Sequence, residues 1–115
     1  MEGHKMNERL LAKMENEQSG FLAALIEANP IEALSMSKRY HVQEAIIHAL
    51  RIEPISEKQA LALLKCSRPL SSVYRHWERM KHRQQIMFLS TLEEYANHII
   101  QLRELCRKKE GGDDE

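Results

Sequence analysis

The sequence predicts an all-α fold, a single compact bundle of four to five helices with a long C-terminal helix. The first observation is compositional: only four Gly and three Pro occur in 115 residues, of which 43% are hydrophobic and 30% charged, as in helix-rich globular domains. The second is that apolar residues recur at helical spacing along most of the chain. The third is that Pro and helix-capping residues stand where this spacing breaks. We expect one helical domain over residues 1–109 and a flexible acidic tail over residues 110–115.

The first predicted helix covers residues 5–28. Its apolar stripe consists of Leu10, Met14, Phe21 and Leu25. The intervals of four and seven residues between these positions place them on one face of a helix. The second helix is predicted to begin at Pro30, because Asn29 is a good N-cap and proline is tolerated at the first helical position.

The second and third helices are predicted to meet near Pro54. Residues 35–43 have poorer apolar periodicity, so we expect a bend or a break in the centre of the second helix. That helix should end before Pro54, because the residue preceding a proline is pushed out of the α region. Ser56 and Gln59 have the spacing of a capping box, which predicts that the third helix starts there.

The fourth predicted helix starts at Pro69 and has one firm apolar face. That face consists of Leu70, Val73, Tyr74 and Trp77. The two aromatic residues are either an exposed anchor for a partner or part of the core, and their helical spacing favours the core. The register is lost between Met80 and Gln85, which predicts a turn or kink in that interval.

The last predicted helix, residues 85–109, carries a heptad-like seam. The candidate dimer seam consists of Phe88, Leu92, Tyr95, Ile99 and Leu102, with Cys106 continuing it. Intervals of four and three are those of a coiled coil. Further apolar residues widen the surface beyond this seam, which favours packing into a globular bundle over a bare two-stranded coiled coil. The sequence therefore leaves a monomer and a homodimer open.

The charge distribution points to a basic surface. Residues 65–83 carry six Lys or Arg against one acidic residue, whereas residues 1–64 carry seven against nine and residues 84–115 carry four against seven. The candidate partner-binding residues are Arg68, Arg75, Arg79, Lys81, His82 and Arg83. Such a cluster attracts phosphates or an acidic protein surface, with a strength that depends on salt. The alternative is that acidic residues of the same chain, namely Glu57, Glu93 and Glu94, fold back against it.

Residues 56–80 can also be interpreted as a helix-turn-helix DNA-binding motif. Such a motif needs two helices locked by a tight turn, with side chains of the second helix free to contact bases and phosphates. Ala62 would lie where the helices touch. The candidate DNA-facing residues are Arg68, Ser71, Ser72 and Arg75. The match is imperfect because Cys66 occupies the position where glycine normally turns the chain. This alternative is a DNA-binding regulator that dimerises through the last helix.

The spacings of chemically reactive residues argue against an enzyme or a metal protein. No two histidines are four apart on a helix and no HExxH motif occurs, so we expect no catalytic residue, no metal and no cofactor. Cys66 is the one thiol placed at a helix start, where nucleophilic cysteines are often found. The two cysteines lack CxxC spacing, and no stretch approaches a signal peptide or a membrane span. We therefore expect a cytoplasmic location, free thiols and no membrane contact.

Residues 55–77, ISEKQALALLKCSRPLSSVYRHW, resemble a family of short bacterial and phage proteins known only as a domain of unknown function. The positions that match its motif are Ser56, Gln59, Ala60, Ala62, Leu63, Leu64, Pro69, Leu70, Tyr74 and Trp77. A weaker similarity extends the match over residues 20–100. The motif consists of helix caps and core residues, so the resemblance implies a shared fold more than a shared activity. The sequence departs from the family after Trp77, where RMKHRQQ adds much of the basic cluster.

The family is associated with phages and other mobile elements, and the resemblance therefore implies an accessory or counter-defence role. Together with the basic cluster, it predicts a non-catalytic interaction protein whose partner is a protein or a ribonucleoprotein. One concrete form is an inhibitor of a host defence complex such as CRISPR–Cas. Binding of DNA is the alternative.

Overall fold

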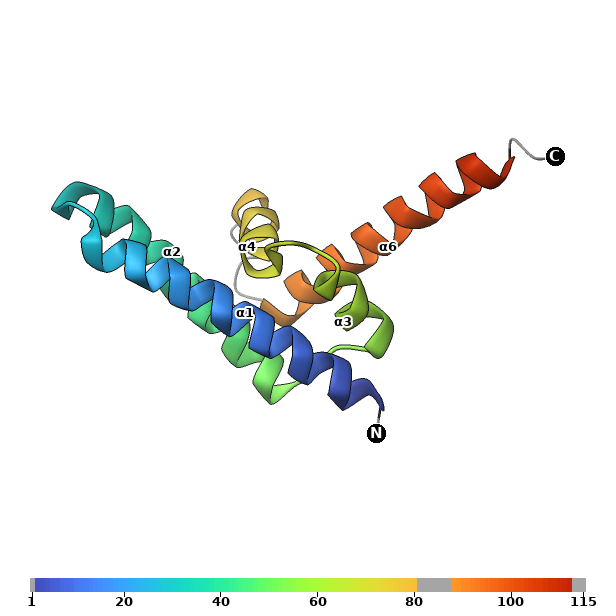
Figure 1. Ribbon diagram of the computed structural model, residues 1–115, viewed down its shortest axis with the longest axis horizontal. Helices are drawn as coiled ribbons and strands as arrows, with labels where there is room; N and C mark the ends of the chain where they lie inside the picture. Colours follow the sequence, from blue (N-terminus) through green and yellow to red (C-terminus); the bar gives the residue numbers. More distant parts are fainter. Residues whose placement is uncertain (1, 81–87, 113–115) are drawn as a thin grey trace.

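A computed structural model describes the backbone of residues 2–80 and 88–112 and the side chains of residues 5–80 and 91–107. Its helices are α1 (Glu2–Glu27), α2 (Pro30–Ile52), α3 (Glu57–Leu64), α4 (Pro69–Arg79) and α6 (Phe88–Gly112). No strand occurs in the described part of the chain (Figure 1). The all-α fold with a long C-terminal helix is confirmed. The turn or kink predicted between Met80 and Gln85 lies mostly outside the described residues, although α4 does end at Arg79.

The capping signals in the sequence act as predicted. The side chain of Asn29 accepts a hydrogen bond from the Glu32 N–H at 2.9 Å, one residue before Pro30 opens α2. Ser56 and Gln59 form the reciprocal capping box of α3, with N···O distances of 3.1 and 3.2 Å. These side chains satisfy N–H groups that the first turn of each helix leaves unpaired.

The bend or break predicted in the centre of α2 is wrong, because α2 is continuous from Pro30 to Ile52. The poorer periodicity of residues 35–43 has another cause. The buried residues of α2 begin only at Val42, so the first half of the helix does not reach the main core. That half pairs with α1 in an antiparallel hairpin that projects from the bundle (Figure 1), where a wide apolar stripe is not needed.

The core lies where the inner halves of α1 and α2 meet α3, α4 and the start of α6. Its largest fully buried apolar side chains are Leu10, Met14, Ile46, Ile47, Leu50, Leu63, Leu70, Val73 and Leu92. Phe21 and Leu25, predicted to extend the stripe of α1, are only half-buried because they lie on the projecting hairpin. The radius of gyration is 15.9 Å, whereas a compact domain of this length has about 13 Å. The centre is therefore compact and the two ends project from it.

Two polar side chains of α1 hold the segment that leads into and out of α3. The Asn7 amide is buried and bonds to both backbone groups of Ile55, donating to the carbonyl at 2.8 Å and accepting from the N–H at 3.2 Å. The Lys13 ammonium donates to the carbonyls of Leu64 and Cys66 at 2.7 and 2.6 Å. A cation at these carbonyls suits the negative end of the α3 dipole.

A third side chain of α1 caps the start of α4. The Glu17 carboxylate accepts hydrogen bonds from the N–H groups of Leu70 and Ser71 at 2.9 and 2.8 Å and from the Ser71 hydroxyl. A carboxylate is favourable at a helix N-terminus because unpaired N–H groups point toward it. Residue Arg68, which precedes α4, provides no side-chain cap of its own. Glu17 therefore fixes the position of α4, which carries most of the candidate site.

Candidate functional site

The described part of the basic surface predicted from the sequence lies on α4 and at its N-cap. Arg68, Arg75 and Arg79 are exposed. Their guanidinium groups have no ion-pair or hydrogen-bond partner within the described side chains. The other three predicted residues, Lys81, His82 and Arg83, lie outside the described part of the chain. Three positive charges of the predicted set are thus available to a partner.

Two of these arginines line a groove of about 320 Å³ between α4 and α6. Its lining consists of Ser72, Arg75, His76, Arg79, Tyr95, His98, Ile99 and Leu102. No acidic residue contributes to this lining, so the groove combines positive charge with a small apolar wall. Such a surface is electrostatically complementary to a carboxylate- or phosphate-rich partner.

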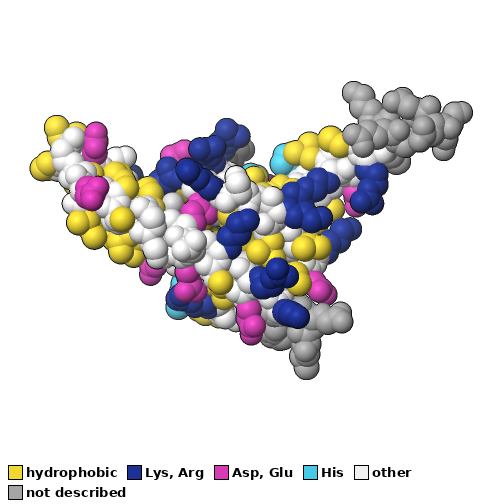
Figure 2. All heavy atoms as spheres, in the orientation of Figure 1, with side chains coloured by type: hydrophobic (Ala, Val, Ile, Leu, Met, Phe, Trp, Pro, Cys, Tyr) yellow, Lys and Arg dark blue, Asp and Glu magenta, His cyan; other side chains and the backbone are white. Residues whose placement is uncertain are grey.

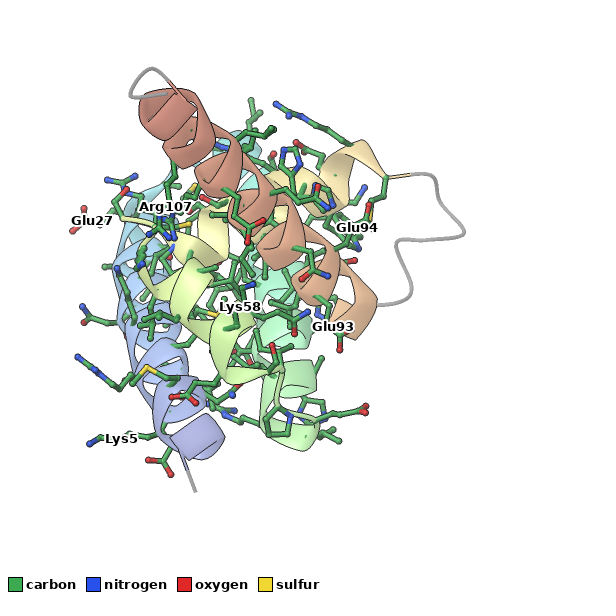
Figure 3. The ribbon with its side chains drawn as sticks, turned by 90° about the vertical axis from the view of Figure 1, so that its right-hand side faces the viewer. Lys5, Glu27, Lys58, Glu93, Glu94 and Arg107 are labelled. Atoms are coloured by element: carbon green, nitrogen blue, oxygen red, sulfur yellow. The ribbon has the colours of Figure 1, made fainter. Side chains whose placement is uncertain are left out.

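The acidic residues that the sequence offered as internal partners neutralise little of this surface. Glu94 of α6 approaches His76, with 3.6 Å between Nε2 and Oε1, which is too long for a hydrogen bond. Glu93 and Glu94 lie near the start of α6 (Figure 3) and line the neighbouring hollow with His76 and His98. Glu57 forms no ion pair with a described side chain. Within the described part of the chain, Arg75 and Arg79 therefore have no ion-pair partner, and Glu93 and Glu94 form a slightly acidic border beside them.

An arginine outside the predicted cluster packs against an aromatic ring of α4. The guanidinium of Arg39, on α2, lies 5.3 Å from the ring centre of Phe21 and 4.9 Å from that of Tyr74. Tyr74 in turn stacks on Trp77 with 5.8 Å between ring centres. Cation–π contact fixes the arginine without neutralising it. Sequence reasoning missed Arg39 because the contact joins three helices that the sequence separates.

The aromatic residues of α4 serve mainly as structure. Tyr74 and Trp77 are half-buried and pack against the core, as their spacing with Leu70 and Val73 predicted. Burial, reinforced by Glu78, raises the pKa of the Tyr74 hydroxyl despite the opposing charge of Arg39. The ring is therefore neutral at physiological pH and acts through packing.

A second basic cluster, which the sequence analysis did not find, lies between α3 and α6. A groove of about 230 Å³ is lined by Lys58 of α3, by its C-cap residue Lys65, and by Arg103 and Arg107 of α6, and its apolar part is Leu61, Ala62 and Ile100. Lys58 is paired with Glu104 at 3.5 Å, and both are exposed. Figure 3 labels Lys58 and Arg107 on their two helices. Charge counts along the chain hid this cluster because residues 84–115 are acidic in total.

Two of the four residues proposed to face DNA in a helix-turn-helix motif are not free to do so. Arg68 and Arg75 are exposed, but Ser71 is bound by Glu17 and Ser72 lines the groove between α4 and α6. Pro69 and Leu70, at the start of α4, are buried. In a DNA-reading helix that end must be free to enter the major groove. The described backbone also contains no positive φ angle, the conformation that a glycine at the turn would supply.

The candidate dimer seam is divided between the core and the surface. Leu92 and Ile99 are buried in the core of the single chain, and Tyr95 is half-buried against it. Leu102 is exposed, and the side chain of Phe88 lies outside those described. A dimer that used all five positions would have to open this core, since α6 packs on α2, α3 and α4 with the same face. Among the seam residues whose side chains are described, Leu102 at the outer end is the one exposed to a second chain.

The described residues hold no cluster suited to a metal ion, and the environment of Cys66 does not activate its thiol. Cys66 is half-buried, and burial raises the pKa of its thiol against the opposing effects of Arg103 and Lys13. A nucleophilic cysteine needs the opposite shift, because the thiolate is the reactive form. No group of three or more His, Cys, Asp or Glu in this part of the chain is close enough to hold a metal ion. Among the helices described, none is both long and apolar enough to cross a bilayer.

Comparisons with known proteins give one family. No curated protein and no solved structure matches the chain. A family model described as "Protein of unknown function (DUF3848)" matches residues 6–100, which include every described helix except the first four residues of α1 and the last part of α6. The resemblance seen over residues 20–100 therefore extends to α1, whose side chains hold α3 and α4. The chain belongs to this family of proteins of unknown function, DUF3848.

Proposed function

We propose that this chain is a non-catalytic interaction protein that binds a negatively charged macromolecular partner through the basic surface of α4. The residues proposed to contact the partner are Arg68, Arg75, Arg79, Lys81, His82 and Arg83. The observation that carries the proposal is that Arg75 and Arg79 form no ion pair with any described side chain and line a groove whose described lining contains no acidic residue. Exposed arginines of this kind add attraction and orientation at a small desolvation cost.

The rigid support of α4 favours a binding role. Glu17 caps its first turn, while Leu70 and Val73 anchor its inner face in the core. The arginines on the outer face therefore project from a fixed helix. Binding a partner then costs little conformational entropy for ordering that helix. The groove beside them offers Tyr95 and Leu102 as apolar contacts, which suit an acidic protein surface better than a bare phosphate chain.

The partner that we favour is a protein or a ribonucleoprotein. The mobile-element association implied by the resemblance suggests which complex the partner belongs to. In this version of the proposal the protein is carried by a phage or another mobile element and inhibits a host defence complex such as CRISPR–Cas. It would do so by covering an acidic or RNA-lined surface of the complex with α4.

The test compares two variants of equal charge change. In one, Arg75→Glu and Arg79→Glu invert the groove; in the control, Lys5→Glu and Arg9→Glu invert two exposed charges of α1. Each protein is immobilised and used to capture partners from a bacterial lysate, and captured complexes are challenged with increasing salt. We expect a salt-sensitive partner that the control retains and the groove variant loses. Equal capture by both variants would contradict the proposal, provided that thermal melts show both to be folded.

Duplex DNA is the second candidate, favoured by the two consecutive helices α3 and α4 and by the exposed Arg68 and Arg75. The Glu17 carboxylate at the start of α4 weighs against it, because it lies where a phosphate would approach. Fluorescence anisotropy with a mixed duplex distinguishes the two. A DNA-binding regulator requires an affinity that falls steeply with salt and a slope that becomes shallower in the Arg75→Glu, Arg79→Glu variant.

A further inference from the structure

The tip of the α1–α2 hairpin is an exposed apolar surface. Ile26, Ile31 and Leu34 are 75%, 84% and 77% exposed, and Leu22 lies beside them at 37%. Figure 2 shows hydrophobic side chains gathered at the left end of the molecule, which is the tip of the hairpin in Figure 1, with acidic side chains among them. Single exposed apolar residues are ordinary, but a contiguous group at a projecting tip is typical of a contact surface.

Acidic residues border this tip, and the first basic residue of α2 is Lys38, one helical turn after Leu34. Residues 14–37 contain four glutamates and no lysine or arginine. Glu27 ends α1 and Glu32 lies in the first turn of α2, so both flank the exposed apolar residues. Figure 3 shows Glu27 at the outer edge of the molecule. A partner for the tip must therefore offer apolar side chains bordered by positive charge.

The outer end of α6 has this combination. Leu102 and Leu105 are 49% and 63% exposed, and they lie on the part of α6 that extends beyond the bundle. A mainly apolar hollow of about 430 Å³ is lined by Ile99, Leu102, Arg103, Cys106 and Arg107. The groove of Lys58, Lys65, Arg103 and Arg107 adjoins it, and the one acidic residue in its lining, Glu104, is paired with Lys58. Apolar residues bordered by positive charge thus stand at the end of the molecule opposite the hairpin tip (Figure 1).

We infer that the hairpin tip of one copy docks on the outer end of α6 of a second copy. Ile26, Ile31 and Leu34 would cover Leu102 and Leu105, while Glu27 and Glu32 would face Arg103 and Arg107. The contact uses two different surfaces and is therefore heterologous. Because the surfaces lie at opposite ends of a molecule 58 Å long, each added copy leaves one of each kind free. The product is an open head-to-tail chain of molecules. This contact differs from the binding activity proposed for α4, although Leu102 lies at the border of both surfaces.

The test uses two full-length variants, each of which disables one end. The tip variant carries Ile31→Glu and Leu34→Glu, and the α6 variant carries Leu105→Glu and Arg107→Glu. All four positions are exposed, so each variant should keep its fold. A matched control, Ile52→Glu, adds a charge at an apolar residue that is 70% exposed but belongs to neither surface.

Light scattering coupled to size exclusion, over a wide range of concentration, gives the readout. We expect the native chain and the Ile52→Glu control to rise in mass with concentration beyond a dimer. Each disabled variant alone should remain a monomer. An equimolar mixture of the two should form a one-to-one dimer and nothing larger, because one intact tip then meets one intact α6 end. High salt should weaken this dimer.

Three results would overturn the inference. A native chain that stays monomeric at every concentration excludes the contact. A variant that still dimerises alone shows a symmetric interface, either tip to tip or α6 to α6. A mixture that remains monomeric shows that the two ends do not recognise each other. Circular dichroism of each variant establishes whether it is folded before these masses are interpreted.

Discussion

At the scale of single residues, the polar side chains of α1 decide how the segment around α3 is placed. Asn7 is the clearest case, because both atoms of its buried amide bond to the backbone of Ile55, 48 residues away. Nothing in the sequence around Asn7 marks it as different from the exposed polar residues of the same helix. Its role depends on where α2 ends, which periodicity cannot give.

The substitution Asn7→Ala should lower the free energy of unfolding by about 2–3 kcal/mol, because it leaves a buried N–H and a buried carbonyl of Ile55 without their partner. Urea denaturation monitored by circular dichroism measures the change. Asn16→Ala, an exposed asparagine on the same helix, is the control and should shift stability by less than about 0.5 kcal/mol. Equal effects at the two positions would show that the contact with Ile55 contributes little.

The two cysteines should differ in reactivity. Burial raises the pKa of Cys66, so less of its thiol is ionised at a given pH, and half-burial also restricts access. Cys106 is exposed. At pH 8, iodoacetamide should therefore modify Cys106 well before Cys66, and the order can be measured by mass spectrometry. The Cys66→Ser and Cys106→Ser variants isolate each rate, and a faster reaction at Cys66 would contradict the assigned environment.

At the scale of the helix, the sequence predicts what local chemistry controls and misses what tertiary contacts control. The caps at Asn29 and Ser56 are in place, because each depends on residues three positions apart. The break expected in α2 is absent, because a hairpin arm needs less apolar surface than a core helix. The basic residues of α4 could be found as a run, whereas the cluster of Lys58, Lys65, Arg103 and Arg107 exists only once α3 and α6 are packed together.

Helix α1 contains a glycine at a position where alanine should be more stable. Gly20 lies inside α1, and a β-carbon added there would meet nothing within 4 Å. Gly20→Ala should therefore raise the free energy of unfolding by about 0.5–1 kcal/mol, because alanine loses less backbone entropy in a helix. The reverse change at the exposed Ala23, Ala23→Gly, should lower it by a similar amount. Thermal melts that show no difference would indicate that α1 is frayed before the molecule unfolds.

At the scale of the whole molecule, stability and interaction surfaces are unevenly distributed. Buried side chains are concentrated where the inner parts of α1 and α2 meet the other helices. The two projecting ends carry most of the exposed large apolar side chains among the described residues. Sequence periodicity treats all apolar positions of a helix alike, so Leu34 and Leu50 look equivalent in α2 although one is 77% exposed and the other fully buried. The positions of the ends, and with them the head-to-tail contact, follow only from the three-dimensional arrangement.

This distribution predicts the pattern of hydrogen exchange. Amides of residues 22–36 can open without disturbing the core, so they should exchange at least about tenfold faster than those of residues 42–50 in the same dilute sample. Mass spectrometry of peptic peptides resolves the two segments. If copies associate end to end, protection should rise with protein concentration in residues 22–36 and 99–107 and stay constant in the core. The Leu105→Glu, Arg107→Glu variant should lose this dependence, because it no longer offers a surface on which the tip of another copy can dock.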